Sequence, residues 1–366
     1  MSGFADGGQP PMPWLEEAWQ AAVAQRGHAL LLYGPPQVGQ FELGLMLAQT
    51  WLCEQPRPVG AADAAQRPCG HCEGCRLLKA GAHPDFRLLV PDSLRASLGL
   101  ELEAAGESEA AEGTAAGGKG KSAGRDIRVG DVRAAIDWTH QTASRGGLKV
   151  LMFHPAHRLN LIAANALLKT LEEPPAPVRV VLTAEDPQLL LPTLRSRCQR
   201  LALRVPASEQ ALAWLEQQGV HGGDILLPAA GGRPQGVLSL IADGVDARLW
   251  PEIPGLVRQG RADALTGLPV PRAIDTLQKV CADAMAMRHG ARPQYFPPES
   301  LPPSASADRL SAWWKRLLVA ARHEDHPWNA GLLIESLVLE GRACWPSARP
   351  ARGSRSAGGR PTAMDA

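Results

Sequence analysis

The sequence predicts an α/β domain built on a parallel sheet, followed by helical regions. In residues 1–205, short apolar runs alternate with helical patterns, which is typical of parallel strands joined by crossover helices. After Pro206 the strand signals fade, and amphipathic helical patterns continue to Trp345. The chain has 366 residues, 45% of them hydrophobic, so it can bury two or three cored domains and is not disordered throughout.

Five short runs are predicted to be the strands of the sheet. They lack the alternation of polar and apolar residues that a strand with one solvated face shows, so we expect both faces of the sheet to be covered. The runs span 30–33, 86–90, 150–153, 178–183 and 201–205.

Helices are predicted between these strands. Residues 41–53 are apolar on nearly every side, residues 129–140 carry apolar side chains at spacings of three and four, and residues 159–172 are stopped by two prolines. The expected organisation is a base over 1–205 with a disordered insertion at 92–124, a small helical segment over 206–245, a helical domain over 246–345 and a flexible tail over 346–366.

Charge and hydropathy exclude two classes of protein. The chain has 38 basic and 37 acidic side chains, which argues against a protein that grips nucleic acid over its whole surface. It shows neither a secretory signal pattern nor about 18 successive apolar residues. We therefore expect a cytoplasmic protein that does not enter membranes.

The frame of a phosphate-binding loop lies between the first predicted strand and helix. Gly34 and Gly39 are spaced as in the loop that cradles nucleotide phosphates, but Gln40 and Phe41 stand where a lysine and a hydroxyl residue are required. No lysine precedes Lys79. We interpret the loop as a turn kept for the fold, with residual nucleotide binding through backbone N–H groups as the alternative.

The acidic residues of a nucleotide hydrolase are also missing. After the strand at 150–153 come two histidines, His154 and His157, and the next acidic residue is Glu172 at the far end of the following helix. Without carboxylates to hold Mg²⁺ and orient water, productive ATP hydrolysis is not expected.

A cysteine cluster has the spacing of a metal site. Cys69, Cys72 and Cys75 form two overlapping C-x-x-C units, and Cys53 lies upstream. Four thiolates satisfy tetrahedral Zn²⁺ and leave no position for a substrate, so the predicted role is structural.

Other interpretations of the cysteines remain open. A redox C-x-x-C pair needs only two of them, and incidental buried thiols need no spacing at all. Cys53 is the weakest assignment, because His71 or His83 offers an alternative fourth ligand.

Two further motifs identify a family. The run 167–175, LLKTLEEPP, precedes a predicted strand, and Ser196-Arg197-Cys198 follows that strand. Together they resemble the bacterial clamp-loader subunits of the AAA+ class over residues 28–205. The cysteine cluster is similar to the zinc module that these subunits insert after the helix of the phosphate loop.

The resemblance implies a fold and a set of partners. The fold would be an α/β P-loop base with a zinc-binding insertion, a helical lid and an all-α collar domain for oligomerisation. The partners would be motor subunits of the gamma/tau type and a delta subunit in a hetero-pentamer. Through that complex the chain would act on primed DNA and the sliding clamp, in the nucleoid-associated replisome.

The resemblance also implies a role for Arg197. In this family the arginine of the Ser-Arg-Cys turn reaches across a subunit interface to the γ-phosphate of ATP bound by the neighbour. Arg197, with Ser196 and Cys198 as its motif, would be this trans arginine finger in a subunit without ATP hydrolysis of its own. From the residues alone, Arg197 is better explained as a solvated side chain at a strand entrance or as the partner in an intramolecular salt bridge. Arg233, near where these lids place a second sensor, is interpreted as structural.

Two other functions are kept as alternatives. An ATP-hydrolysing motor subunit of the same loader would need a lysine at position 40 and a carboxylate near position 154. A zinc-stabilised scaffold outside replication would make no use of Arg197.

Overall fold

The computed structural model describes residues 4, 10–58, 66–100, 124–145, 147–175, 177–303, 305–322 and 329–345. Contacts divide the chain into two compact units, which are described separately. The first holds the described residues of Met1–His221 and Gly232–Leu238, and the second those of Gly222–Gly231 and Ser239–Ala366. The chain thus crosses between the units inside the helical segment predicted at 206–245.

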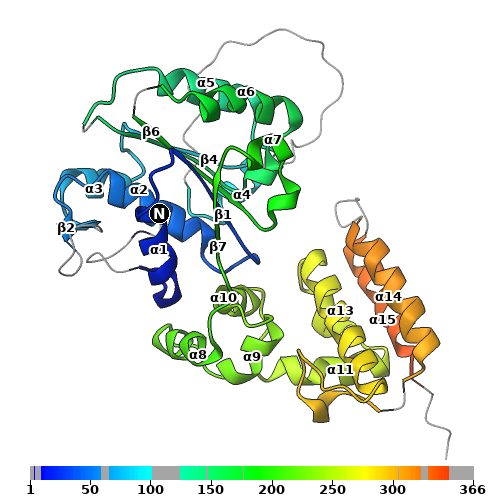
Figure 1. Ribbon diagram of the computed structural model, residues 1–366. Coiled ribbons are helices and arrows are strands. Elements are labelled where there is room, and N and C mark those ends of the chain that lie inside the picture. Colours follow the sequence, from blue (N-terminus) through cyan, green and yellow to red (C-terminus); the bar gives the residue numbers. More distant parts are fainter. Residues whose placement is uncertain are drawn as a thin grey trace, which may run out of the picture. The chain divides into compact units, whose positions relative to one another are not determined.

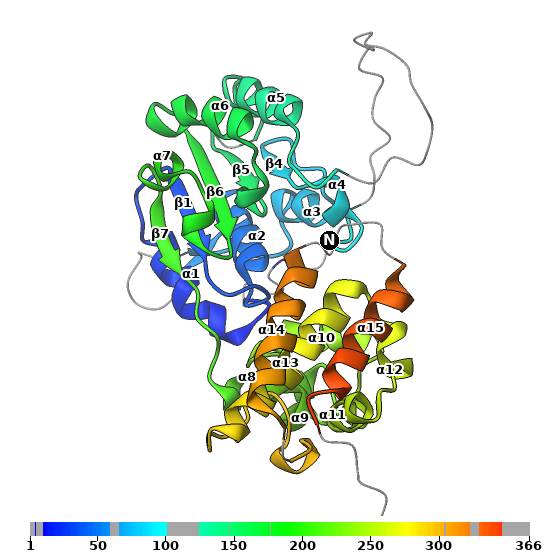
Figure 2. The same ribbon diagram turned by 90° about the vertical axis from the view of Figure 1, so that its right-hand side faces the viewer.

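A five-stranded parallel sheet forms the centre of the first unit, in the order β4-β5-β6-β1-β7 (Figures 1 and 2). Leu31 of β1 lies beside Leu182 of β6 and Arg200 of β7. The prediction of a parallel sheet of five strands is confirmed. The strands are β1 (Ala29–Tyr33), β4 (Phe86–Leu89), β5 (Lys149–Phe153), β6 (Val178–Ala184) and β7 (Gln199–Ala202).

The last strand begins earlier than the sequence predicts. Residues 201–205 are the more apolar run, yet β7 begins at Gln199 and ends at Ala202. This strand lies at the edge of the sheet, and three of its four residues are exposed. An edge strand need not be apolar on both faces, so the rule that locates the central strands misplaces this one.

Helices cover both faces of the sheet (Figure 1). On one face, Leu31 and Leu151 belong to a core shared with α5 and α6, which pack side by side. On the other face, α2 comes so close that a Cβ at Gly44 would lie 2.4 Å from the methyl carbon of Met152. The covering helices are α2 (Gln40–Trp51), α5 (Val129–Thr139) and α6 (Leu161–Glu172).

An N-terminal helix that the sequence analysis did not assign packs on α2. The 3-10 helix η1 (Pro13–Leu15) leads into α1 (Glu16–Val23). Trp19 of α1 is fully buried, and its indole N–H donates to the Thr50 hydroxyl of α2 at 3.0 Å. A first proline and two glutamates in the first turn are the signals that mark this helix start.

Short elements complete the first unit. The predicted insertion at 92–124 begins with the helix α4 (Asp92–Arg95), where Asp92 forms an ion pair with Arg128, and residues 101–123 lie outside the described residues. The other elements, including α10, which crosses between the units, are β2 (Arg57–Pro58), β3 (Gln66–Arg67), α3 (Glu73–Lys79), η2 (Ala156–Arg158), η3 (Pro187–Leu189), α7 (Pro192–Arg195), α8 (Ser208–Gln217) and α10 (Pro234–Ala242).

The second unit is helical in its described part. The helices α13, α14 and α15 pack against one another, and α11 packs against α15 (Figure 1). Trp250 stacks on Phe296 with ring centroids 4.5 Å apart. The predicted tail 346–366 lies outside the described residues. The helices are α9 (Gly223–Ala229), α11 (Leu249–Gln259), α12 (Asp263–Thr266), α13 (Val270–Arg288), η4 (Pro298–Ser300), α14 (Ala307–Arg322) and α15 (Ala330–Arg342).

Among the described helices, none has the length and apolar character that crossing a bilayer requires.

Candidate functional site

The phosphate-loop frame joins the end of β1 to the start of α2. Gly39 precedes the helix with φ of +106°, a conformation that glycine adopts without strain. The loop therefore has the backbone shape expected between a buried strand and a helix. Its function depends on what fills it.

The side chain of Gln40 folds back onto the loop. Its amide Nε2 donates to the carbonyl of Gly34 at 2.6 Å and to that of Pro35 at 2.7 Å, and the side chain is buried. Both donors are thus committed to the loop itself. The neutral amide also lacks the positive charge that stabilises the β- and γ-phosphates.

The N-terminal segment covers the same loop from outside. The indole N–H of Trp14 donates to the Val38 carbonyl at 2.9 Å. A Cβ at Gly39 would lie 3.0 Å from both methyl carbons of Leu15 and 3.1 Å from the sulfur of Met12. These contacts leave no room for a side chain at position 39.

Phe41 lies in the first turn of α2, and His154 directly follows β5. Their rings pack with centroids 4.7 Å apart. The Thr183 hydroxyl donates to the Phe153 carbonyl and so accepts from Nδ1 of His154, 2.7 Å away. Burial, followed by the charge of His157, lowers the pKa of His154 to about 4. An aromatic ring and a neutral imidazole offer a divalent cation no negative charge.

One carboxyl group follows the loop closely in the sequence, but it is hydrogen-bonded to another side chain. Glu42, in the first turn of α2, accepts a hydrogen bond of 2.5 Å from the Gln235 amide. Burial raises the pKa of Glu42, an effect that the hydrogen bonds only partly oppose. Its proton affinity is thus increased and its value as a metal ligand reduced.

The structure brings the four predicted cysteines together. The Sγ atoms of Cys53, Cys69, Cys72 and Cys75 all lie within 4.8 Å of one another, and the last three residues are buried. The cluster begins beyond the end of α2 and continues into α3, whose N-cap is Cys72. A group of four sulfur atoms at this spacing has the donor set and size to hold a metal ion.

Backbone N–H groups support the sulfurs as they do in thiolate sites. The N–H of Cys69 donates to the sulfur of Cys53 at 3.2 Å, that of Cys72 to Cys69 at 3.2 Å, and that of Cys75 to Cys72 at 3.4 Å. Burial alone raises the pKa of Cys69, but the backbone donors of His71 and Cys72 outweigh it and lower the pKa to about 7. The cluster is thus built to favour a sulfur anion at this position.

The two histidines considered as alternative ligands are engaged elsewhere. The His71 Nδ1 atom lies 2.9 Å from the Cys69 carbonyl. His83 is buried and accepts a hydrogen bond from the Asp85 N–H at 3.1 Å. Cys53 therefore completes the cluster found in the structure.

The Ser-Arg-Cys turn lies between α7 and β7, and its outer residues hold it in place. The Ser196 hydroxyl donates to the Thr193 carbonyl at 3.1 Å. Cys198 packs into the core beneath α6, where burial raises its thiol pKa to about 12. The thiol is therefore a packing group, and Arg197 between these two anchors projects from a fixed turn.

Arg197 forms an ion pair with Glu172, the last residue of α6. Its Nε donates to Oε1 of Glu172 at 2.7 Å, its Nη2 contacts the same oxygen, and its Nη1 donates to the Thr193 carbonyl at 2.8 Å. The arginine side chain is 31% exposed and the glutamate side chain 48% exposed. This is the intramolecular contact that the sequence left open.

The ion pair joins the two family motifs. Within LLKTLEEPP, Leu167 and Leu171 are buried under the sheet, while Glu172 reaches the Ser-Arg-Cys turn. Sequence reasoning identified both motifs but not this contact or the N-terminal cover of the loop. An arginine and a glutamate 25 residues apart give no signal by themselves.

Comparison with known proteins places the chain in one family. A family model described as "DNA polymerase III, delta subunit" matches residues 15–207. The DNA polymerase III subunit delta' of Pseudomonas aeruginosa is 35% identical over 239 residues, which is 64% of this chain and 62% of that protein. The chain thus spans less than two thirds of that relative.

Other relatives extend the same picture. The DNA polymerase III subunit tau of Salmonella typhimurium is 31% identical over 189 residues, or 52% of this chain and 23% of that protein. The subunit delta' of Escherichia coli is 32% identical over 294 residues, or 76% of this chain and 77% of that protein. The family model and this alignment together show that the chain belongs to the DNA polymerase III subunit delta' family.

Proposed function

We propose that this chain is the non-hydrolysing delta-prime subunit of the DNA polymerase III clamp loader, an AAA+ assembly. In it the chain acts as a rigid stator and supplies Arg197 in trans to a neighbouring ATPase subunit. One observation carries the proposal. The chain's own phosphate loop is filled by its own side chains, whereas its one family-specific arginine is presented at the surface.

The filled loop supports the absence of hydrolysis. A nucleotide would have to displace Gln40 from two loop carbonyls, and it would still meet Phe41 and His154 in place of a metal ion and its carboxylates. The lost lysine and metal are the groups that neutralise developing charge during phosphoryl transfer. Weak binding through backbone N–H groups is compatible with this state, but turnover is not.

The setting of Arg197 supports a trans role. Glu172, Thr193 and Ser196 engage Nε, both N–H groups of Nη1 and one N–H of Nη2, which leaves the second N–H of Nη2 for a phosphate oxygen. The guanidinium is thereby oriented before a neighbour arrives. An arginine finger contributes about 10³ to 10⁵ in rate when it reaches the transferred phosphoryl group.

The remaining parts fit the same assembly. Structural Zn²⁺ held by Cys53, Cys69, Cys72 and Cys75 would fix the segment between α2 and α3. We assign the lid to 206–245 and the oligomerisation collar to 246–345. The partners would be motor subunits of the gamma/tau type and a delta subunit in a hetero-pentamer, which acts on primed DNA and the sliding clamp in the cytoplasmic replisome.

Reconstitution tests the proposal. The purified chain is expected to show no ATP turnover above background, whereas a complex rebuilt with motor and delta subunits hydrolyses ATP in response to primed DNA and clamp. A cross-linker placed at position 197 is expected to join the chain to the nucleotide-binding subunit beside it. Turnover by the isolated chain at the rate of a motor subunit would instead support the ATPase alternative. Full clamp loading without this chain would support a scaffold outside replication.

A further inference from the structure

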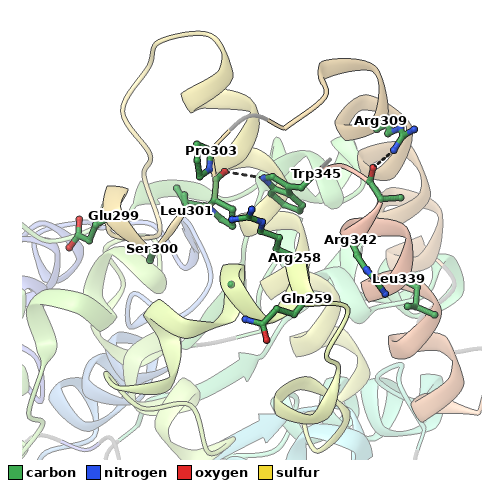
Figure 3. Close-up of a pocket in the computed structure, with 13 residues that line it drawn as sticks. Arg258, Gln259, Glu299, Ser300, Leu301, Pro303, Arg309, Leu339, Arg342 and Trp345 are labelled. Atoms are coloured by element: carbon green, nitrogen blue, oxygen red, sulfur yellow. Dashed lines mark hydrogen bonds between the residues drawn. The ribbon is translucent and has the colours of Figure 1, made fainter. Parts of the chain in front are cut away.

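A cavity of about 920 Å³ lies in the second unit, between the C-terminal ends of α11 and α15 and the segment around η4 (Figure 3). The proposed function makes no use of it. Its walls combine basic and apolar side chains. They are formed by Gly255, Arg258, Gln259, Glu299, Ser300, Leu301, Pro302, Pro303, Arg309, Leu339, Arg342, Ala343 and Trp345.

Three guanidinium groups line this cavity, against a single carboxyl group. Arg258 lies in the last turn of α11, Arg342 in the last turn of α15, and Arg309 near the start of α14. Glu299 is the one acidic residue of the lining and lies apart from the arginines in Figure 3. The cavity is therefore positively charged on balance.

Two of these arginines are not neutralised by the described part of the chain. Neither Arg258 nor Arg342 forms a hydrogen bond or an ion pair with any residue that the structure describes, although both are exposed. By contrast, Arg261 nearby is paired with Asp263 at 2.8 Å. Basic groups left without a counter-charge inside a concave wall favour an anionic ligand.

The stem of Arg342 passes close to the backbone at the end of α11. Gly260 ends α11 with φ of +77°, and a Cβ there would lie 2.8 Å from Cδ and 3.4 Å from Nη1 of Arg342. Only a glycine lets the arginine stem cross the end of α11 at this distance. The guanidinium of Arg342 is thus brought beside the helix that carries Arg258.

Hydrogen bonds also fix the opposite wall. Arg309 donates to the Ala343 carbonyl at 2.6 Å, and the Ser306 N–H donates to the Cys344 carbonyl at 2.8 Å. The indole N–H of Trp345 donates to the Pro302 carbonyl at 3.0 Å, and this bond crosses the cavity wall in Figure 3. The wall is therefore preorganised, which lowers the entropic cost of binding.

The lining favours a peptide over a nucleic acid. Single-stranded nucleic acids bind by stacking their bases on exposed aromatic rings, but Trp345, the aromatic residue of the lining, is only 4% exposed. Leu339 and Pro303, which are both exposed, instead offer aliphatic surface beside the arginines. Carboxylates together with aliphatic side chains complement both features.

We propose that this cavity is a docking site for an acidic, aliphatic peptide segment of a partner protein. Its carboxylates would bind Arg258 and Arg342 through paired N–H donors, and its aliphatic side chains would pack on Leu339 and Pro303.

A binding assay on the full chain tests this site. The probe is a short fluorescein-labelled peptide of alternating Glu and Leu, and its partner probe has Gln in place of Glu. The double variant Arg258→Glu/Arg342→Glu is expected to bind the Glu peptide at least about a hundredfold more weakly, because each lost charge-assisted contact is worth about tenfold or more. The Gln peptide is expected to bind comparably weakly to both proteins.

A charge-matched variant supplies the control. Arg248→Glu/Arg322→Glu makes the same change of charge at exposed arginines of the same unit that are not part of the lining. This control is expected to bind within about threefold of the unchanged chain. Thermal unfolding of each variant establishes that it is folded.

Three results would overturn the proposal. The first is no binding of the Glu peptide by the unchanged chain up to about 1 mM, the limit of weak recognition. The second is an equal loss of binding in the control variant. The third is a labelled single-stranded oligonucleotide that binds more tightly than the peptide and depends on the same two arginines, which would assign the cavity to nucleic acid.

Discussion

The phosphate loop and the Ser-Arg-Cys turn both adjoin strands of the same sheet, but their polar side chains differ in exposure: Gln40 is buried, whereas Arg197 is 31% exposed. At the loop, Gln40 binds the carbonyls around it, Phe41 packs on His154, and Trp14 covers the outside. At the turn, the partly exposed Arg197 pairs with Glu172 and keeps one N–H of Nη2 without a partner in the described part of the chain.

This difference indicates that the polar groups of the loop maintain its conformation, whereas the arginine of the turn is available to a ligand. The loop keeps its strand-to-helix geometry because Gln40 satisfies two of its carbonyl groups from within. The turn keeps a charged group exposed, where an exposed ion pair contributes little to stability. Retaining such a group makes sense when a second molecule uses it.

Disrupting the cysteine cluster is expected to have the largest effect, and only on the loop's half of the comparison. The cluster follows α2, the helix that begins at the phosphate loop, and includes no residue of the Ser-Arg-Cys turn. Cys75→Ser is expected to abolish stoichiometric Zn²⁺ binding and to destabilise this region by several kcal/mol, since structural zinc contributes on the order of 10 kcal/mol in small modules. Native mass spectrometry and hydrogen exchange check this. Residues 66–79 should lose protection while residues 192–202 keep it. Cys344→Ser, a buried thiol outside the cluster, should retain zinc.

Arg197→Ala tests the exposed side of the comparison. It is expected to lower the DNA-stimulated ATPase rate of the neighbouring site by about 10³, or about 4 kcal/mol, because the transition state loses its trans guanidinium. Assembly of the complex, followed by gel filtration, should be unchanged. Arg195→Ala, two residues away, should leave the rate as it was. Equal rates for the two variants would contradict the role of Arg197.

Gln40→Ala tests the other half of the comparison, the phosphate loop. The change leaves the carbonyls of Gly34 and Pro35 without the hydrogen bonds that Gln40 donates. It is expected to lower the free energy of unfolding by about 3 kcal/mol. Denaturant unfolding measures it, with the exposed Gln217→Ala as the control. The ATPase rate of the complex should not change. A fall in that rate would show that the loop takes part in nucleotide chemistry after all.

His154 predicts a pH dependence. Its folded pKa of about 4 lies below the unfolded value, so between these values the unfolded chain binds more protons and stability falls as the pH falls. From pH 7 to pH 5 the expected loss is about 2 kcal/mol. His154→Gln should flatten this part of the unfolding profile relative to the unchanged chain. An unaltered slope would mean that the imidazole is not held neutral.

Glu172→Gln is expected to have the smallest effect. Its charge positions Arg197, and a looser guanidinium should lower kcat of the neighbouring site by about fivefold, or about 1 kcal/mol, without changing KM for ATP. Glu173→Gln, the adjacent exposed glutamate, is the matched control. A change in KM alone would show that Glu172 does not act through the orientation of Arg197.

The sequence was most informative where one residue type has one physical use. Unbroken apolar runs located the buried strands β1, β5 and β6, and the C-x-x-C spacing selected three of the four clustered cysteines. The expectation that the loop does not support ATP hydrolysis rests on the same kind of signal, because Gln40 and Phe41 cannot supply a positive charge or a hydroxyl group.

The sequence was least informative about side-chain contacts between residues that are far apart along the chain. Glu172 contacts Arg197 across 25 residues, and Trp14 contacts Val38 across 24. Neither spacing follows the period of a helix or a strand, so only the folded chain reveals these contacts. The edge strand β7 was misplaced for a related reason, since Gln199 and Arg200 carry no apolar pattern.

The edge strand β7 also disfavours one kind of contact at this side of the sheet, which is backbone pairing with a strand of another protein. β7 pairs with β1 over only four residues, and Gln199 and Arg200 are exposed. A short strand with polar and charged side chains is a poor template for a further strand. A neighbouring protein that reaches Arg197 would therefore contact side chains and not the backbone of β7. The two proteins could then associate and dissociate without a backbone rearrangement in either.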